Sequence, residues 1–192
     1  MTLSDENAFG VLVAYFDIDE DEYALEPDDF ITRFTEFRSA ALGFFHEFPL
    51  AAAVHVLDVG HALFAEIADG DQLDDPMAWG KALRAALRGR GIATSVFVTH
   101  GGRWVEEDAG PPAEVDRGAP GSVCVQVSRP SEPLRRALLG WAAACRADTD
   151  DTVGWGPGLY VDTEAVEALG RAPKNAPTPL VMAGATFYRL GS

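Results

Sequence analysis

A short segment between two apolar runs carries the residue types that bind transition metals. It contains His55, Asp58 and His61, with Gly60 in the tight turn of an expected hairpin. On such a hairpin we expect His55 and His61 to face each other across the two strands, with Asp58 at the turn. Two imidazoles and a carboxylate suit zinc or iron. Ordinary strand histidines at a sheet edge give the same pattern, and we favour that interpretation because no further ligand lies nearby.

A second candidate is His100, which follows an expected strand over 92–99 and precedes Gly101 and Gly102. A histidine at a strand end beside two glycines could act as a general base with room for a ligand. A turn that needs glycines predicts the same residues, and we favour it. No nucleophile signature surrounds any Ser or Cys, and Cys124 and Cys145 are interpreted as small buried hydrophobes. The sequence therefore predicts no catalytic residues and no cofactor, and favours a non-enzymatic protein.

Negative charge is concentrated in the N-terminal part of the chain. The 192 residues carry a formal net charge of -15, yet residues 1–75 hold eighteen Asp and Glu against two Arg. Such an asymmetry predicts an interaction surface. We expect partner contacts from this acidic band and from two exposed Trp: Asp19, Glu20, Asp21, Glu22, Glu26, Asp28, Asp29, Trp104 and Trp155. A solvated loop, or acidity inherited from genome composition or salt adaptation, is the alternative explanation.

The charge and the composition also narrow the classes of partner and location. A strongly acidic chain is a poor match for DNA or RNA, and no apolar run approaches the length that spans a bilayer. The N-terminus lacks the features of a signal peptide, so a cytoplasmic location is expected. Acidic faces speed binding to basic surfaces. The leading hypothesis is therefore an acidic bacterial protein-binding module, most concretely an immunity- or antitoxin-type protein that neutralises a basic effector. Its partner and its oligomeric state are left open.

The first half of the chain predicts the elements that would position these residues. An apolar strand over 9–18 precedes a helix from Pro27 to about His46, whose Phe residues recur at helical spacing. Strands over 52–57 and 62–67 form the hairpin, and a helix over 77–90 leads into the strand over 92–99. The order β-α-β-β-α-β predicts an α+β, ferredoxin-like core over about 9–106, with a mostly antiparallel sheet and both helices on one face.

The second half predicts an extension of that sheet. After a Pro- and Gly-rich loop over 107–121 come a strand over 122–128, a helix from Ser131 to about Arg146, a short strand at 159–161 and a helix over 163–169. A strand over 180–189 ends the sequence. This β-α-α-β extension is expected to complete one sheet, so that 1–192 is a single domain with a possible sub-boundary at 107–121.

The order of elements over about 9–106 resembles the core of class III nucleotidyl cyclases. In that family the first strand ends in a metal-binding Asp, and Asp17 in Tyr15-Phe16-Asp17-Ile18 matches its place. The family's second metal-binding Asp follows a Gly in the hairpin, where this sequence has His61 after Gly60. The resemblance implies a palm-type architecture that lacks the full metal site unless Asp58 substitutes. The alternative hypothesis is therefore a ligand-binding or enzymatic domain of this architecture, with Asp17, His55, Asp58 and His61 as metal candidates.

Overall fold

A computed structural model describes nine stretches of the chain: residues 7–15, 27–47, 55–58, 62–68, 75–102, 131–147, 156–170, 179–182 and 185–190. The strands are β1 (Asn7–Tyr15), β2 (His55–Asp58), β3 (Ala62–Ala68), β4 (Thr94–Gly102), β5 (Leu159–Asp162), β6 (Leu180–Met182) and β7 (Ala185–Leu190). The helices are α1 (Pro27–Glu47), α2 (Pro76–Arg88), α3 (Glu132–Ala147) and α4 (Thr163–Ala168). None of these helices is long and apolar enough to cross a membrane.

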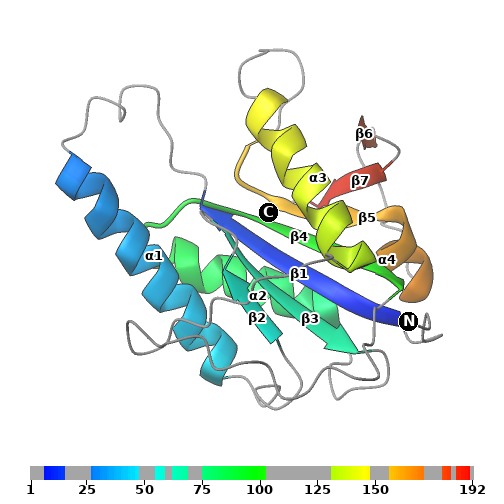
Figure 1. Ribbon diagram of the computed structural model, residues 1–192, viewed down its shortest axis with the longest axis horizontal. Helices are drawn as coiled ribbons and strands as arrows, with labels where there is room; N and C mark the ends of the chain where they lie inside the picture. The colour runs from blue at the N-terminus through cyan, green and yellow to red at the C-terminus, as the bar shows by residue number, and fades with distance from the viewer. Residues whose placement is uncertain are drawn as a thin grey trace.

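The strands form one seven-stranded sheet in the order β2-β3-β1-β4-β5-β7-β6 (Figure 1). Within it, β1 pairs antiparallel with β3 on one side and with β4 on the other. The neighbours β2, β3, β1 and β4, with α1 and α2, reproduce the predicted ferredoxin-like βαββαβ order. Beyond β4 the sheet continues through β5, which is parallel to β4, and then through β7 and β6. The predicted α+β class and the extension of one sheet are both confirmed.

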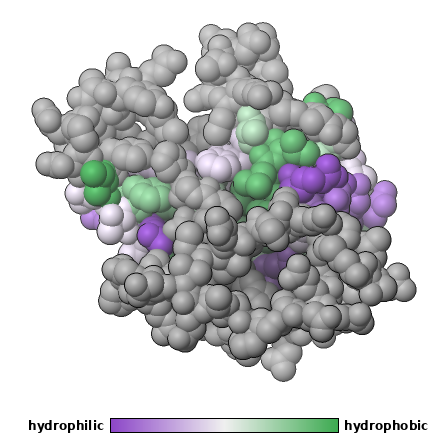
Figure 2. All heavy atoms as spheres, in the orientation of Figure 1, coloured by the Kyte–Doolittle hydropathy of each residue, from purple (hydrophilic) through white to green (hydrophobic). Residues whose placement is uncertain are grey.

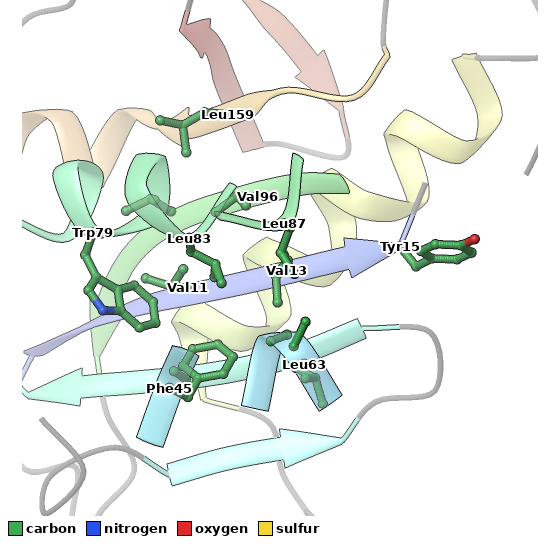
Figure 3. Packing of buried hydrophobic residues seen from close by; sticks show 14 of the residues in the cluster. Val11, Val13, Tyr15, Phe45, Leu63, Trp79, Leu83, Leu87, Val96 and Leu159 are labelled. Atoms are coloured by element: carbon green, nitrogen blue, oxygen red, sulfur yellow. The ribbon is translucent and has the colours of Figure 1, made fainter. Parts of the chain in front are cut away.

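The central strand β1 contributes side chains to two cores because successive residues point to opposite faces. Val11, Val13 and Tyr15 pack with α1 and α2 on one face, as Figure 3 shows. Leu12 and Ala14 pack with α3 on the other. A strand covered on both faces is expected to be a continuous apolar run, which explains the sequence Val11-Leu-Val-Ala-Tyr15.

The first core is filled by one apolar stripe from each of two helices. In α1 the buried residues Phe37, Ala41 and Phe45 recur at spacings of four, while Phe34 is only partly buried. In α2 the Oδ1 of Asp75 accepts hydrogen bonds from the N–H groups of Met77 and Ala78 at 3.1 and 3.0 Å and so caps the helix. The inward face of α2 carries Trp79, Leu83 and Leu87 (Figure 3).

The helix α3 lies very close to the opposite face of the sheet because three glycines leave room for it. A Cβ at Gly10 would lie 2.6 Å from the Phe64 ring, and one at Gly101 would lie 2.8 Å from Glu132 Cγ. A Cβ on the helix at Gly140 would lie 2.7 Å from the Phe187 ring. On this side of the molecule, hydrophobic side chains at the position of α3 adjoin hydrophilic ones toward α4 (Figure 2).

Two predicted boundaries differ from the observed ones. The expected strand over 180–189 is instead two antiparallel strands, β6 and β7, because Leu180 pairs with Phe187 and Met182 pairs with Ala185. The expected turn at Gly101-Gly102 is instead the end of β4, whose Gly102 pairs with Asn7. The predicted strand over 122–128 and the sub-boundary at 107–121 lie outside the described residues.

Candidate functional site

One end of the sheet brings together the last residue of β1 and the first residues of β4 and β5. Tyr15 pairs with Thr94 at this end, and the N–H of Val96 donates to the carbonyl of Gly158, just before β5, at 2.8 Å. We call it the Tyr15 end. Asp17 follows Tyr15 by two positions in the sequence and lies outside the described residues.

A buried hydroxyl at the Tyr15 end has no hydrogen-bond partner among the described residues. It belongs to Thr94, which is 2% exposed. An unsatisfied buried hydroxyl costs roughly 1–3 kcal/mol, so such groups are uncommon in folded proteins. The neighbouring Ser95 makes only a long contact, 3.5 Å from its Oγ to the carbonyl oxygen of Gly156.

Arginine side chains from both faces of the sheet meet at the same end. Arg84 comes from α2, and Arg189 comes from β7 on the face that Phe187 shares with α3. Each donates a hydrogen bond from its Nη2 to the carbonyl oxygen of Pro157, and both distances are 3.2 Å. Arg88, one turn along α2, adds a third positive charge. Burial, followed by repulsion from Arg88 and Arg189, lowers the pKa of Arg84 below its usual value.

The loop beneath the arginines is held by a buried tyrosine. The hydroxyl of Tyr160 donates to the Gly156 carbonyl at 2.6 Å and accepts from the Gly156 N–H at 3.2 Å. Burial raises the pKa of Tyr160 above 10.0, so its hydroxyl stays protonated at neutral pH. A Cβ at Gly158 would lie 3.0 Å from Nε of Arg189, so the absence of a side chain at this position leaves room for the guanidinium group.

A groove of about 460 Å³ lies between α1 and the segment that joins α2 to β4. It is lined by two hydroxyls, one carboxylate, one guanidinium and one apolar side chain: Thr35, Ser39, Glu36, Arg90 and Ile92. Ile92 lies two residues before β4, so the groove adjoins the Tyr15 end. Its volume is within the range of small-molecule sites, roughly 300–1,000 Å³.

A buried ionic network lies at the opposite end of the sheet. Arg136 Nε on α3 is 2.6 Å from Oδ2 of Asp162, whose side chain is fully buried. Arg136 also pairs with Glu164. The other oxygen of Asp162 accepts from the N–H of Ala165 at 2.7 Å and so caps α4. Burial raises the pKa of Asp162 above 3.8 despite these donors and the N–H of His100. Both oxygens of the Asp162 carboxylate have hydrogen-bond donors, so we interpret this network as structural.

The predicted metal residues are not brought together by the described backbone. In the β2–β3 hairpin His55 pairs with Glu66, and Asp58 pairs with Leu63, so the expected opposition of His55 and His61 is wrong. The physical reason is register: Asp58 pairs with Leu63, so His55, three residues earlier in β2, pairs with Glu66, three residues later in β3. Asp17 and His61 lie outside the described residues, as do the side chains of His55 and Asp58. No group of three metal-ligating side chains exists in the described part of the chain.

The other predicted candidates are placed as follows. His100 lies inside β4, with its ring 4.6 Å from that of Phe9, rather than in a turn. The partner-binding candidates Asp19–Glu26, Trp104 and Trp155 lie outside the described residues, as do the side chains of Asp28 and Asp29. Arg84, Arg189, Arg136 and Asp162 were not predicted from the sequence. The signal available for Arg84 was the spacing of Lys81, Arg84 and Arg88, which places three basic residues along one face of α2.

No family model matches the sequence, and no curated protein matches it. The structure is similar to the guanylyl cyclase Cya2, with a TM-score of 0.56 and 10% identity over 98% of this chain and 93% of that one. It is similar to the adenylyl cyclase CyaB from P. aeruginosa (TM-score 0.56, 9% identity, 100% and 97% covered). The guanylyl cyclase domain of the RhoGC fusion protein from the aquatic fungus Blastocladiella emersonii gives 0.53 and 10%, with 99% and 98% covered. At these identities the likeness shows the fold.

The comparisons correct the leading functional hypothesis. The chain was predicted to be an immunity- or antitoxin-type module, and that prediction is wrong, since the structural matches are cyclase domains along nearly their whole length. The error came from using charge as a guide to function. The negative charge of the N-terminal part affects how soluble the protein is and how it associates, and proteins of many folds carry such charge. The alternative, a domain of nucleotidyl-cyclase-like architecture, agrees with the findings.

Proposed function

We propose that this chain is a ligand-binding domain of nucleotidyl-cyclase-like architecture, that its ligand is a purine nucleotide, and that it lacks the full metal site for cyclisation. The nucleotide lies at the Tyr15 end of the sheet. The remaining predictions, a cytoplasmic location and a basic protein partner, are independent of this proposal.

The observation that carries the proposal is the agreement of fold over 98–100% of the chain with three solved cyclase domains. Fold alone does not determine function, because one architecture hosts many activities. The Tyr15 end adds local support. Three features lie at this end. The strand β1, which precedes Asp17 in the sequence, ends here, and the buried Thr94 hydroxyl has no partner among the described residues. Arg84 and Arg189 also meet here, and arginine side chains suit phosphate.

The residues present do not fit a two-metal phosphoryl-transfer site. Such chemistry needs two carboxylates to hold the ions, and Mg²⁺ takes oxygen ligands in octahedral geometry. The resemblance supplies Asp17, but His61 stands where the second carboxylate is expected. The register moves His55 away from His61 and opposite Glu66. We therefore derive no catalytic step through metal ions, and the proposal is limited to binding.

Calorimetric titration of the full chain with GTP, ATP and guanosine, together with an assay for cyclic nucleotide product in Mg²⁺ and in Mn²⁺, tests this function. We expect one nucleotide to bind per chain, with the triphosphate stronger than the nucleoside, and no cyclic product above the blank. Absence of binding by both triphosphates at millimolar concentration would contradict the proposal. Rapid formation of cyclic product would show that the chain completes a metal site by other residues.

A further inference from the structure

The strand β4 buries three hydroxyl side chains, which differ in how their hydrogen bonds are satisfied. Thr99 donates from its Oγ1 to the carbonyl oxygen of Pro133 at 2.8 Å, and Ser95 makes the long contact with Gly156 described above. The Oγ1 of Thr94 has no hydrogen-bond partner among the described residues, although this residue is only 2% exposed. Native structures satisfy nearly all such groups, so this exception needs an explanation.

The fold itself gives no reason for a hydroxyl at position 94. Thr94 pairs with Tyr15, and residues directly opposite each other in a sheet point to the same face. That face belongs to the first core, which contains Tyr15, Ile92 and Val96. Valine has nearly the shape of threonine, suits a strand equally well and needs no hydrogen bond in such surroundings. The threonine therefore costs stability, and a cost of this kind is expected at a functional site.

Position 94 adjoins the groove between α1 and the segment that joins α2 to β4. Ile92 lines this groove, lies two positions before Thr94 and belongs to the same core. The groove is therefore on the side of the sheet to which the Thr94 side chain points. Its volume of about 460 Å³ is enough for a planar ring system.

The surroundings of Thr94 favour an uncharged partner for the hydroxyl. A threonine hydroxyl can both donate and accept a hydrogen bond. Burial of an ionised group at an apolar site costs far more than burial of a neutral hydrogen-bonding group, so a phosphate is a poor partner here. The edge of a purine base presents neutral N–H donors together with ring-nitrogen or carbonyl acceptors.

We propose that Thr94 binds the base of the ligand, through a hydrogen bond between its hydroxyl and the neutral edge of a purine that enters from the groove. This inference rests on the proposed function and deepens it, because it identifies the residue that contacts the base. It is independent of the metal ligands that the cyclase resemblance implies, since Thr94 lies on β4 and none of those ligands does.

The variants Thr94→Val and Thr94→Ser test this inference, with Thr99→Val as the matched control on the same strand. Without ligand, we expect Thr94→Val to melt at or above the temperature of the wild type. Thr99→Val should melt lower, because it leaves the Pro133 carbonyl without its donor.

Calorimetric titration with GTP, ATP, guanosine and adenosine measures the contact with the base. For the purine that the wild type binds, Thr94→Val should bind roughly 2- to 10-fold more weakly, the range expected for one neutral hydrogen bond. The factor should be the same for the nucleoside and for its triphosphate. Thr94→Ser keeps the hydroxyl and should keep most of the affinity, and Thr99→Val should bind like the wild type.

The outcomes separate this inference from the proposed function. A melting temperature that falls as much in Thr94→Val as in Thr99→Val overturns the inference, because the hydroxyl then serves the fold. Unchanged nucleotide affinity in Thr94→Val also overturns it and leaves the proposed function intact. A loss confined to the triphosphates overturns it too, since the hydroxyl would then contact phosphate. If neither the triphosphates nor the nucleosides bind the wild type, the proposed function fails and the inference fails with it.

Discussion

Arg136 and Asp162 form a buried ion pair between α3 and the start of α4, with 2.6 Å between Nε and Oδ2. The Asp162 side chain is fully buried and that of Arg136 is 10% exposed, so both charged groups are largely desolvated. The pair joins the helix that covers one face of the sheet to the strand that extends the core beyond β4. It therefore ties together two elements of the C-terminal extension, α3 and β5.

Removing the cation from this pair should destabilise the fold strongly. In Arg136→Met the buried carboxylate of Asp162 keeps its backbone donors but loses its counter-charge, a change that typically costs about 3–5 kcal/mol. Arg135→Gln, one residue away and exposed, should cost no more than about 1 kcal/mol. Urea denaturation gives both values. Equal effects of the two substitutions would show that the buried pair contributes nothing beyond a surface one.

The same carboxylate predicts a pH dependence of stability. Burial raises the pKa of Asp162 above 3.8, so the folded protein binds a proton there at higher pH than the unfolded chain does. The contribution of this group to stability is therefore fully present below the unfolded pKa and is lost as pH rises through the raised pKa. Asp162→Asn removes the ionisable group, so the stability of this variant lacks the pH-dependent contribution.

Denaturation of the wild type and of Asp162→Asn at about pH 7 and about pH 4 measures this linkage. The free energy of unfolding of the wild type, minus that of the variant, should increase on acidification. A difference that shrinks toward low pH would mean that Arg136 and the backbone donors hold the pKa of Asp162 below its usual value.

Two helical glycines should respond in opposite ways to alanine. In α3 a Cβ at Gly140 would lie 2.7 Å from the Phe187 ring and 2.9 Å from that of Phe97, both core residues. Gly140→Ala should therefore cost about 1–3 kcal/mol through overpacking. In α1 nothing lies within 4 Å of a Cβ at Gly43, so Gly43→Ala should stabilise by up to about 1 kcal/mol. Thermal melting of both variants checks the sign, and stabilisation by Gly140→Ala would refute the close packing of α3.

The elements with strong apolar periodicity were predictable from the sequence. The Phe residues of α1 and the run Val11–Tyr15 define a stripe and a buried strand, and Asp75-Pro76 marks the start of α2. These local signals sufficed for the ferredoxin-like order, because it follows from the types of six successive elements. The hairpin of β6 and β7 was missed, since the run from Leu180 to Leu190 is nearly continuous and only Ala183-Gly184 interrupts it.

The candidate site was far less predictable. Arg84, Pro157 and Arg189 are separated by up to 105 positions and meet only because β5 and β7 are added beside β4. No local pattern reports a contact of that kind. Asp162 looked like an ordinary polar residue after a strand, and its burial depends on α3, which reaches it through Arg136. The sequence pattern instead drew attention to clustered charge, which is conspicuous and carries little information on function.

The most direct test of the central claim is where a nucleotide binds. Titration of the ¹⁵N-labelled chain with GTP, and separately with ATP, followed by backbone amide NMR, maps the contact residue by residue. We expect saturable shifts that are largest at the Tyr15 end, at the amides of Tyr15, Thr94, Ser95, Gly156 and Gly158. Little change is expected at the opposite end, at Gly101 and Ala165. Shifts confined to that opposite end, or none with either nucleotide at millimolar concentration, would contradict a nucleotide site at the Tyr15 end.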